Sequence, residues 1–117
     1  MQLLKIEKGS EVFHAIDFAL NNLYKMHTEL SKEDDLEDVF GKGERKFCFK
    51  VAKQTKKMIA KLNKHNILDL NTGFKCNIAN ISIDHYLEEY VGLDDELDIN
   101  TYRMKRLQKQ IQKIWGV

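Results

Sequence analysis

The four histidines are the side chains of this sequence that suit proton transfer or metal binding best. His14 falls on the polar side of the first amphipathic segment, whereas His27 falls on its apolar side. His65 stands at a helix end, and His85 follows an aspartate. No two of the four are four residues apart, and the sequence contains neither Cys-x-x-Cys nor His-Glu-x-x-His. The spacing favours a packed His27 and three surface imidazoles, and leaves open only a metal site assembled across the fold.

Other patterns that carry catalysis or ion binding are incomplete in this sequence. A nucleophilic Cys48 would need a nearby base and a depressed pKa, and the sequence indicates neither. The acids at 94–98 alternate like the start of a calcium loop, but Ile99 stands where glycine is needed and Lys105 where glutamate is needed. We therefore predict a protein that is not an enzyme and binds no cofactor or metal. The alternative is an enzyme built on His27, His85 and nearby carboxylates.

Lysines recur on one side of a helix that the sequence predicts over residues 44–65. At 100° per residue they fall within a strip about 80° wide. Like charges four residues apart repel by a few tenths of a kcal/mol per pair, so the strip requires a counter-charge. The acidic stretches 29–38 and 84–98 could supply it within the chain, and a phosphate backbone could supply it from outside. The strip comprises Lys46, Lys50, Lys53, Lys57, Lys61 and Lys64.

The net charge of +1 conceals opposed blocks, because residues 29–38 and 84–98 are acidic whereas 42–64 and 103–113 are basic. Such blocks predict a dipolar surface. A length of 117 residues fits one domain over 1–117, with N-terminal helices (1–43), a central segment (44–83) and C-terminal helices (84–117). The sequence has no secretory signal and no apolar run long enough to cross a membrane, so we expect no membrane partner. Its two cysteines are interpreted as free thiols, which favours a cytoplasmic protein.

The first forty residues predict a short strand at 2–7 and two helices. Apolar residues at helical spacing over 12–30 follow Ser10, which is a suitable N-cap. A short helix within 31–40 opens at Ser31 in a variant of the capping box, with Leu36, Val39 and Phe40 facing inward. Two glycines, at 41 and 43, then end it.

The second half predicts a β-hairpin followed by two helices. Asn66 suits a left-handed helix end, and the loop Asn71-Thr72-Gly73 stands between two apolar runs, which indicates a hairpin over 67–83. Ser82 would cap a helix over 83–91, and a last helix would span 94–115. The last helix has an apolar seam that suits packing either on a second copy of the chain or on the first helix. The seam comprises Met104, Leu107, Ile111 and Ile114.

The stretch 51–68 resembles the recognition helix of winged helix-turn-helix DNA-binding proteins. In that family a small polar start is followed by Thr, an apolar pair, Leu, a turn residue and two apolar residues that open the wing. The matching residues here are Thr55, Met58, Ile59, Leu62, Asn66, Ile67 and Leu68, and the loop 71–73 resembles the wing. The resemblance covers about residues 46–82. It implies a mainly α fold with one β-hairpin, in which C-terminal helices follow a winged-helix-like core.

The same resemblance implies which residues would bind DNA. Lys53, Gln54 and the neighbouring lysines at 56 and 57 would face the major groove, with the lysines at 61, 64 and 75 nearer the phosphates. We therefore expect a small non-enzymatic DNA-binding regulator. The absence of proline and the abundance of Lys, Asn and Ile suggest an AT-rich source such as a phage or another mobile element. The partner would be double-stranded DNA, bound by a homodimer formed through 94–115. The predicted nucleic-acid-binding residues are Lys46, Lys50, Lys53, Gln54, Lys56, Lys57, Lys61, Lys64 and Lys75.

An alternative function uses the acidic blocks. A protein-interaction or inhibitor module could present carboxylates to a basic, nucleic-acid-binding protein. Its partner-binding residues would be Glu88, Glu89, Asp94, Asp95, Glu96 and Asp98.

Overall fold

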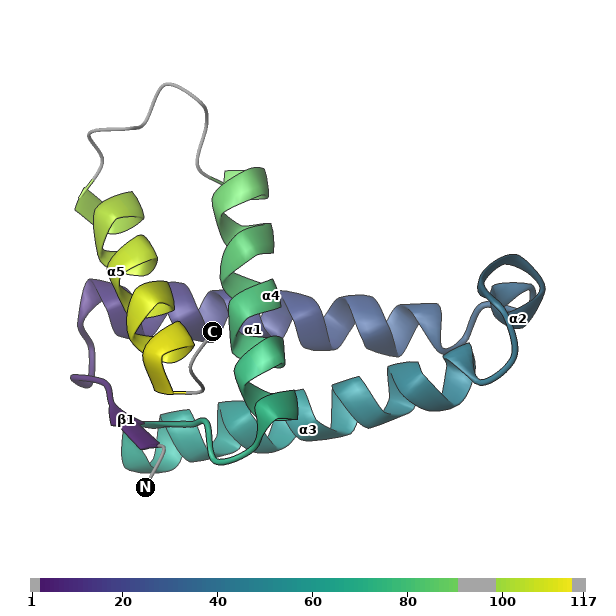
Figure 1. The fold of residues 1–117 in the computed structure, drawn as a ribbon, viewed down its shortest axis with the longest axis horizontal. Helices are drawn as coiled ribbons and strands as arrows, with labels where there is room; N and C mark the ends of the chain where they lie inside the picture. The colour runs from purple at the N-terminus through teal and green to yellow at the C-terminus, as the bar shows by residue number, and fades with distance from the viewer. Residues whose placement is uncertain (1–2, 91–98, 115–117) are drawn as a thin grey trace.

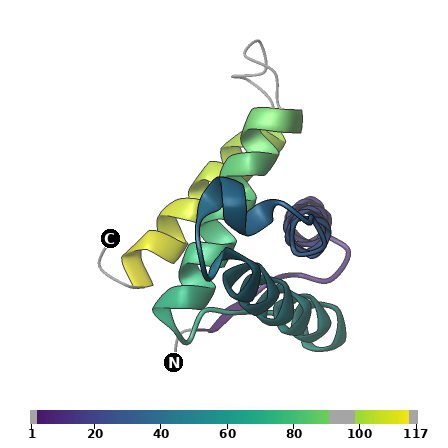
Figure 2. The ribbon, with the colours of Figure 1, turned by 90° about the vertical axis from the view of Figure 1, so that its right-hand side faces the viewer.

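The computed structural model describes residues 3–90 and 99–114, and within them the chain forms five helices and two short strands (Figure 1). Two long helices, α1 and α3, run antiparallel, and the pair α4 and α5 crosses them; Figure 2 shows α1 and α3 nearly end-on. This architecture is mainly helical with one antiparallel strand pair, as the sequence predicts. In chain order the elements are β1 (Leu3–Lys5), α1 (Glu11–Leu30), α2 (Leu36–Phe40), α3 (Glu44–His65), β2 (Ile67–Asp69), α4 (Gly73–Tyr90) and α5 (Ile99–Ile114).

Local capping explains where the two long helices begin and end. Ser10 Oγ accepts a hydrogen bond from the backbone N–H of Phe13 at 3.1 Å, which caps α1. α3 begins after Gly43, whose φ is 88°, and ends at Asn66, whose φ is 58°. Both residues tolerate this left-handed region better than most side chains do. The predicted boundaries of both helices are therefore confirmed to within one residue.

The core lies where the helix pair α1 and α3 meets the pair α4 and α5. Every helix except α2 contributes to it, together with β2. Burial of aliphatic side chains of this size contributes about 1.5–3 kcal/mol each. The larger fully buried members are Ile16, Leu20, Leu23, Met58, Leu62, Leu68, Leu70, Ile83, Met104 and Ile111.

The strand pairing and the wing differ from the sequence prediction. β2 pairs with β1 near the N-terminus, with Leu4 opposite Leu68, so three helices separate the two strands. The predicted hairpin over 67–83 is wrong, because α4 occupies the place of its second strand. Thr72 Oγ1 accepts a hydrogen bond from the Lys75 backbone N–H at 3.1 Å, as an N-cap does. The Asn-Thr-Gly sequence therefore starts a helix here and does not form the loop of a wing.

Three smaller predictions are also corrected. Ser31 ends α1 and does not open α2, whose N-cap residue is Asp35. Val39 and Phe40 are exposed and do not face inward; Leu36 is the buried residue of α2. Ser82 lies inside α4, where its hydroxyl donates to the carbonyl of Ile78 at 2.8 Å, so no new helix begins there.

The C-terminal helix packs within the chain. Met104, Leu107 and Ile111 are buried, and α5 contacts both α4 and α1. The seam thus packs on α4 as well as on the first helix, and its buried members Met104, Leu107 and Ile111 offer no free surface to a second copy. No helix of the described residues has the length and the apolar character needed to cross a bilayer.

Candidate nucleic-acid interface

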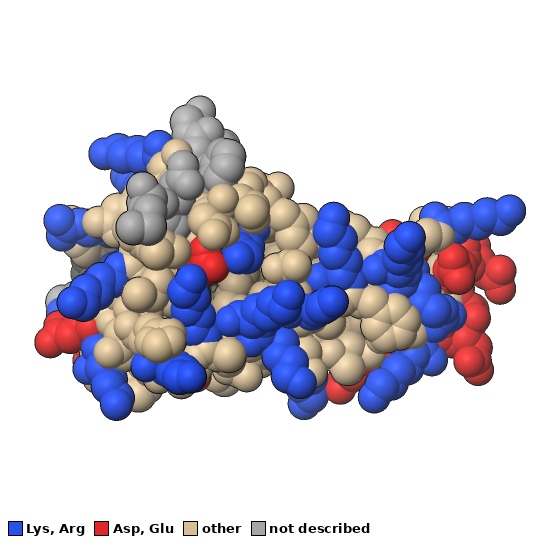
Figure 3. Space-filling model, turned by 90° about the horizontal axis from the view of Figure 1, so that it is seen from below, with Lys and Arg blue, Asp and Glu red and all other residues tan. Residues whose placement is uncertain are grey.

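α3 has one side in the core and the opposite side in solvent. Val51, Met58 and Leu62 anchor the buried side, mainly against α1. The lysines that lie away from these anchors are exposed, and Figure 3 shows basic side chains along this surface of the molecule. We call this surface the lysine face; it comprises Lys46, Lys50, Lys53, Lys56, Lys57 and Lys64.

The lysine face has no acidic partner among the described residues. The ion pairs within 3–90 and 99–114 are those of Arg45 with Glu37, of Lys61 and Lys75 with a shared aspartate, and of Arg103 with Glu11. None of them includes a lysine of the face. Within this part of the chain, the repulsion among its ammonium groups is therefore not offset by salt bridges.

The acidic block 29–38 is held by Arg45 at one end of α3. The Arg45 side chain donates to the carbonyl oxygens of Ser31 and Glu33, and its Nε lies 3.7 Å from a Glu37 carboxylate oxygen. Figure 3 shows acidic side chains gathered at one end of the molecule, beyond most of the lysines. Internal neutralisation by this block therefore reaches Arg45 and not the lysine face.

Two lysines that the sequence assigns to phosphate binding instead surround Asp69. Lys75 Nζ lies 2.8 Å from Asp69 Oδ2, and Lys61 Nζ lies 3.4 Å from the same atom. Asp69 Oδ1 also accepts a hydrogen bond from the Asn71 backbone N–H at 3.1 Å. Lys75 is in the first turn of α4, not on a wing strand. The single Asp69 carboxylate thus offsets one of their two positive charges inside the chain.

Burial alone would raise the pKa of Asp69. The hydrogen bonds from Lys75 and Asn71 and the two lysine charges outweigh that effect, so the pKa of Asp69 lies below its ordinary value. No motif or spacing in the sequence singles out this residue. Its one signal is an aspartate inside the apolar run 67–70, where an unpaired carboxylate would be costly.

The remaining predicted site residues are dispersed. Gln54 is half-buried on α3, and Glu88 and Glu89 are exposed near the end of α4. Asp94, Asp95, Glu96 and Asp98 lie outside the described residues. Of the acidic residues that the alternative function would use, the structure therefore describes only Glu88 and Glu89.

The groups that could do redox or metal chemistry are not assembled in the described residues. Cys48 and Cys76 are buried free thiols. Burial raises the pKa of both, and Glu44 adds to the effect at Cys48, so both are protonated near neutral pH. No group of three or more His, Cys, Asp or Glu side chains within 3–90 and 99–114 could hold a metal ion.

An apolar pocket of about 240 Å³ lies beside the lysine face, where α1, α3 and α4 meet. The rings of Phe47 and Phe74 meet edge to face there, with centroids 6.4 Å apart. Lys50 of the lysine face places Nζ 4.7 Å from the Phe74 centroid, so the pocket and the lysine face adjoin. The lining residues are Leu23, His27, Phe47, Val51, Phe74, Asn77, Ile78 and Ile81.

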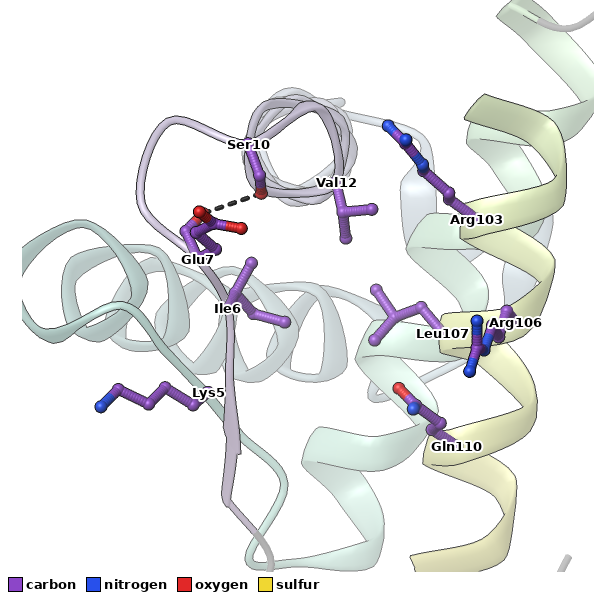
Figure 4. A pocket seen from close by; sticks show the side chains of 9 residues that line it. All are labelled: Lys5, Ile6, Glu7, Ser10, Val12, Arg103, Arg106, Leu107 and Gln110. Carbon is purple, nitrogen blue, oxygen red and sulfur yellow. Dashed lines mark hydrogen bonds between the residues drawn. The ribbon is translucent and has the colours of Figure 1, made fainter. Parts of the chain in front are cut away.

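A larger cavity of about 450 Å³ lies between the start of α1 and α5 (Figure 4). Its lining mixes charges of both signs, with Glu7 facing a rim that holds Arg103 and Arg106. Arg103 is already paired with Glu11 at 2.7 Å. The Ser10 hydroxyl, which also lines the cavity, donates a hydrogen bond to the Glu7 carbonyl oxygen at 2.7 Å. Arg103 and the Ser10 hydroxyl of this cavity are therefore already bound to groups of the chain itself, whereas the lysines of the lysine face have no acidic partner among the described residues.

Comparison with known proteins finds no matching family model, no similar curated protein and no similar solved structure. The function is therefore inferred from the chain's own residues.

Proposed function

We propose that this chain is a small non-enzymatic DNA-binding protein that holds the phosphate backbone of DNA on the lysine face of α3. The observation that carries the proposal is the set of six exposed lysines on α3 that have no acidic partner among the described residues. A polyanion would offset their mutual repulsion and release counterions as it bound.

The dimensions of α3 suit this role. Lys46 and Lys64 are separated by about 27 Å of helix at 1.5 Å per residue, so the lysine face can follow several successive phosphates. The major groove of B-DNA admits an α-helix, and a helix with one solvent-facing side can approach it. Within this arrangement Gln54 would contact base edges. Lys61 and Lys75 would contribute less, because both are held by the Asp69 carboxylate, which offsets one of their two charges.

The salt dependence of DNA binding tests the proposal. Six lysine–phosphate contacts predict that log K falls with log salt with a slope on the order of −5. Affinity for a mixed-sequence duplex, measured by fluorescence anisotropy, would then fall roughly 1,000-fold between about 50 and 200 mM salt. Absence of binding at the lowest salt, or binding that salt does not weaken, would contradict the proposal.

A further inference from the structure

The apolar pocket between α1, α3 and α4 has exposed apolar side chains in its lining, and phosphate binding by the lysine face does not explain them. Phe47 is 47% exposed and Ile81 is 46% exposed, although both are large apolar side chains at the mouth of a pocket. Exposed apolar surface of this kind marks an interaction site more often than scattered single residues do. An occupant of this pocket would therefore present an apolar or aromatic face.

The position of the pocket restricts that occupant. Lys50 lies against Phe74 on one wall, and the helix that carries Phe47 and Val51 also carries the lysine face. A strand whose phosphates lie on the lysine face therefore passes the pocket mouth. Aromatic side chains beside a cationic groove are the combination with which proteins bind unpaired bases, because every base has a flat face that can stack.

The pocket also offers polar groups that could contact a base edge. His27 Nδ1 donates a hydrogen bond to the Leu23 carbonyl oxygen at 2.9 Å. With the proton on Nδ1, the other ring nitrogen, Nε2, can accept a hydrogen bond from a ligand. Asn77 adds an amide, which can donate and accept, at the exposed side of α4. A mainly apolar pocket with a few polar groups is the usual composition of a site for a small planar ligand.

Resting on the proposed function, we infer that this pocket receives one unpaired base of a nucleic-acid strand whose phosphates lie on the lysine face. A volume of about 240 Å³ is smaller than most sites for extended ligands and suits a single ring system. A docked amphipathic helix would need several apolar anchors along a longer groove. The protein then binds single strands, or duplexes with an unpaired base, more tightly than intact duplex DNA.

Strands with and without bases test this inference on the wild-type protein. One oligonucleotide carries thymine at every position, and a second of equal length carries abasic sites at its central positions with the same phosphates. We expect the first to bind about 10-fold more tightly, because base stacking on aromatic side chains contributes a factor of this order. Phe47→Ala should remove that difference. Phe40→Ala is the matched control, since Phe40 is exposed on α2, lies outside the lysine face and does not line the pocket.

The possible outcomes separate the two proposals. Equal wild-type affinity for both strands would overturn the inference and leave the lysine face as the whole interface. Failure to bind either strand or any duplex at low salt would overturn the proposed function itself. Self-association of the free protein that Phe47→Ala abolishes would identify a second copy as the occupant, and would overturn the base-binding assignment.

Discussion

The double variant Lys53→Glu/Lys57→Glu is expected to bind duplex DNA at least about 100-fold more weakly than the wild type. Both side chains are exposed near the middle of the lysine face, and neither has an ion-pair partner among the described residues. The substitutions remove two phosphate contacts and place two carboxylates beside the phosphates, so attraction becomes repulsion. Anisotropy titrations at constant low salt measure the change.

A matched control separates the location of these charges from their number. Lys105→Glu/Lys109→Glu makes the same change in net charge at two exposed positions of α5, away from the lysine face. This variant should bind within a few-fold of the wild type. If both variants lose affinity equally, binding depends on overall charge and not on α3. If neither loses affinity, the lysine face is not the interface.

Asp69→Asn is expected to lower the free energy of unfolding by about 2 kcal/mol at neutral pH. The Asp69 side chain is 7% exposed and accepts from Lys75, which would keep its charge without a counter-charge. The cost stays below that of a fully buried pair because Lys61 and Lys75 retain access to water, with side chains 37% and 17% exposed. Urea unfolding followed by circular dichroism measures the difference.

The pH dependence of stability provides the second readout for Asp69. Because its pKa is lowered by folding, the unfolded chain holds more protons than the folded chain between the two pKa values. The stabilisation is therefore fully present above the ordinary value of about 3.8 and is lost as pH falls through the lowered pKa. The difference between wild type and Asp69→Asn should shrink at acidic pH. A difference that is constant down to pH 2 would show that the carboxylate charge does not stabilise the fold.

Local sequence signals predicted the long helices because their physics is local. α1 has a side-chain N-cap at Ser10, and α3 has apolar residues at helical spacing and a left-handed end at Asn66. The lysines and the core side of α3 follow from the same 3.6-residue period, so their exposure could be predicted as well. In these segments the local preferences and the tertiary packing favour the same structure.

The region 67–83 could not be predicted because its apolar residues lie on more than one side of α4. Cys76, Ala79 and Ile83 enter the core, whereas Phe74 and Ile81 line the neighbouring pocket. Such a helix has little contrast between its faces, and an Asn-Thr-Gly sequence before it is equally typical of a turn. The apolar run does predict the strand Ile67–Asp69, but the partner of this strand lies more than sixty residues earlier in the chain.

The parts of the candidate site that depend on distant segments were not predictable either. Lys61 and Lys75 come from two helices, and both pair with Asp69 of β2. This pairing sets them apart from the lysines of the lysine face, which pair with no acid among the described residues. The pocket draws Leu23, Phe47 and Phe74 from three helices. No spacing within one segment indicates such a juxtaposition, because it depends on how α4 crosses α1 and α3.

The most direct test of the central claim is to map DNA binding onto the chain by nuclear magnetic resonance. Amide resonances of the labelled protein would be followed as a mixed-sequence duplex is added at low salt. The account predicts that the largest shifts fall on residues 46–57 of α3, with smaller shifts at 61–64 and little change on the exposed side of α5. Shifts concentrated on α5 or near Glu88 and Glu89, with α3 unchanged, would contradict the assignment of the lysine face as the nucleic-acid interface.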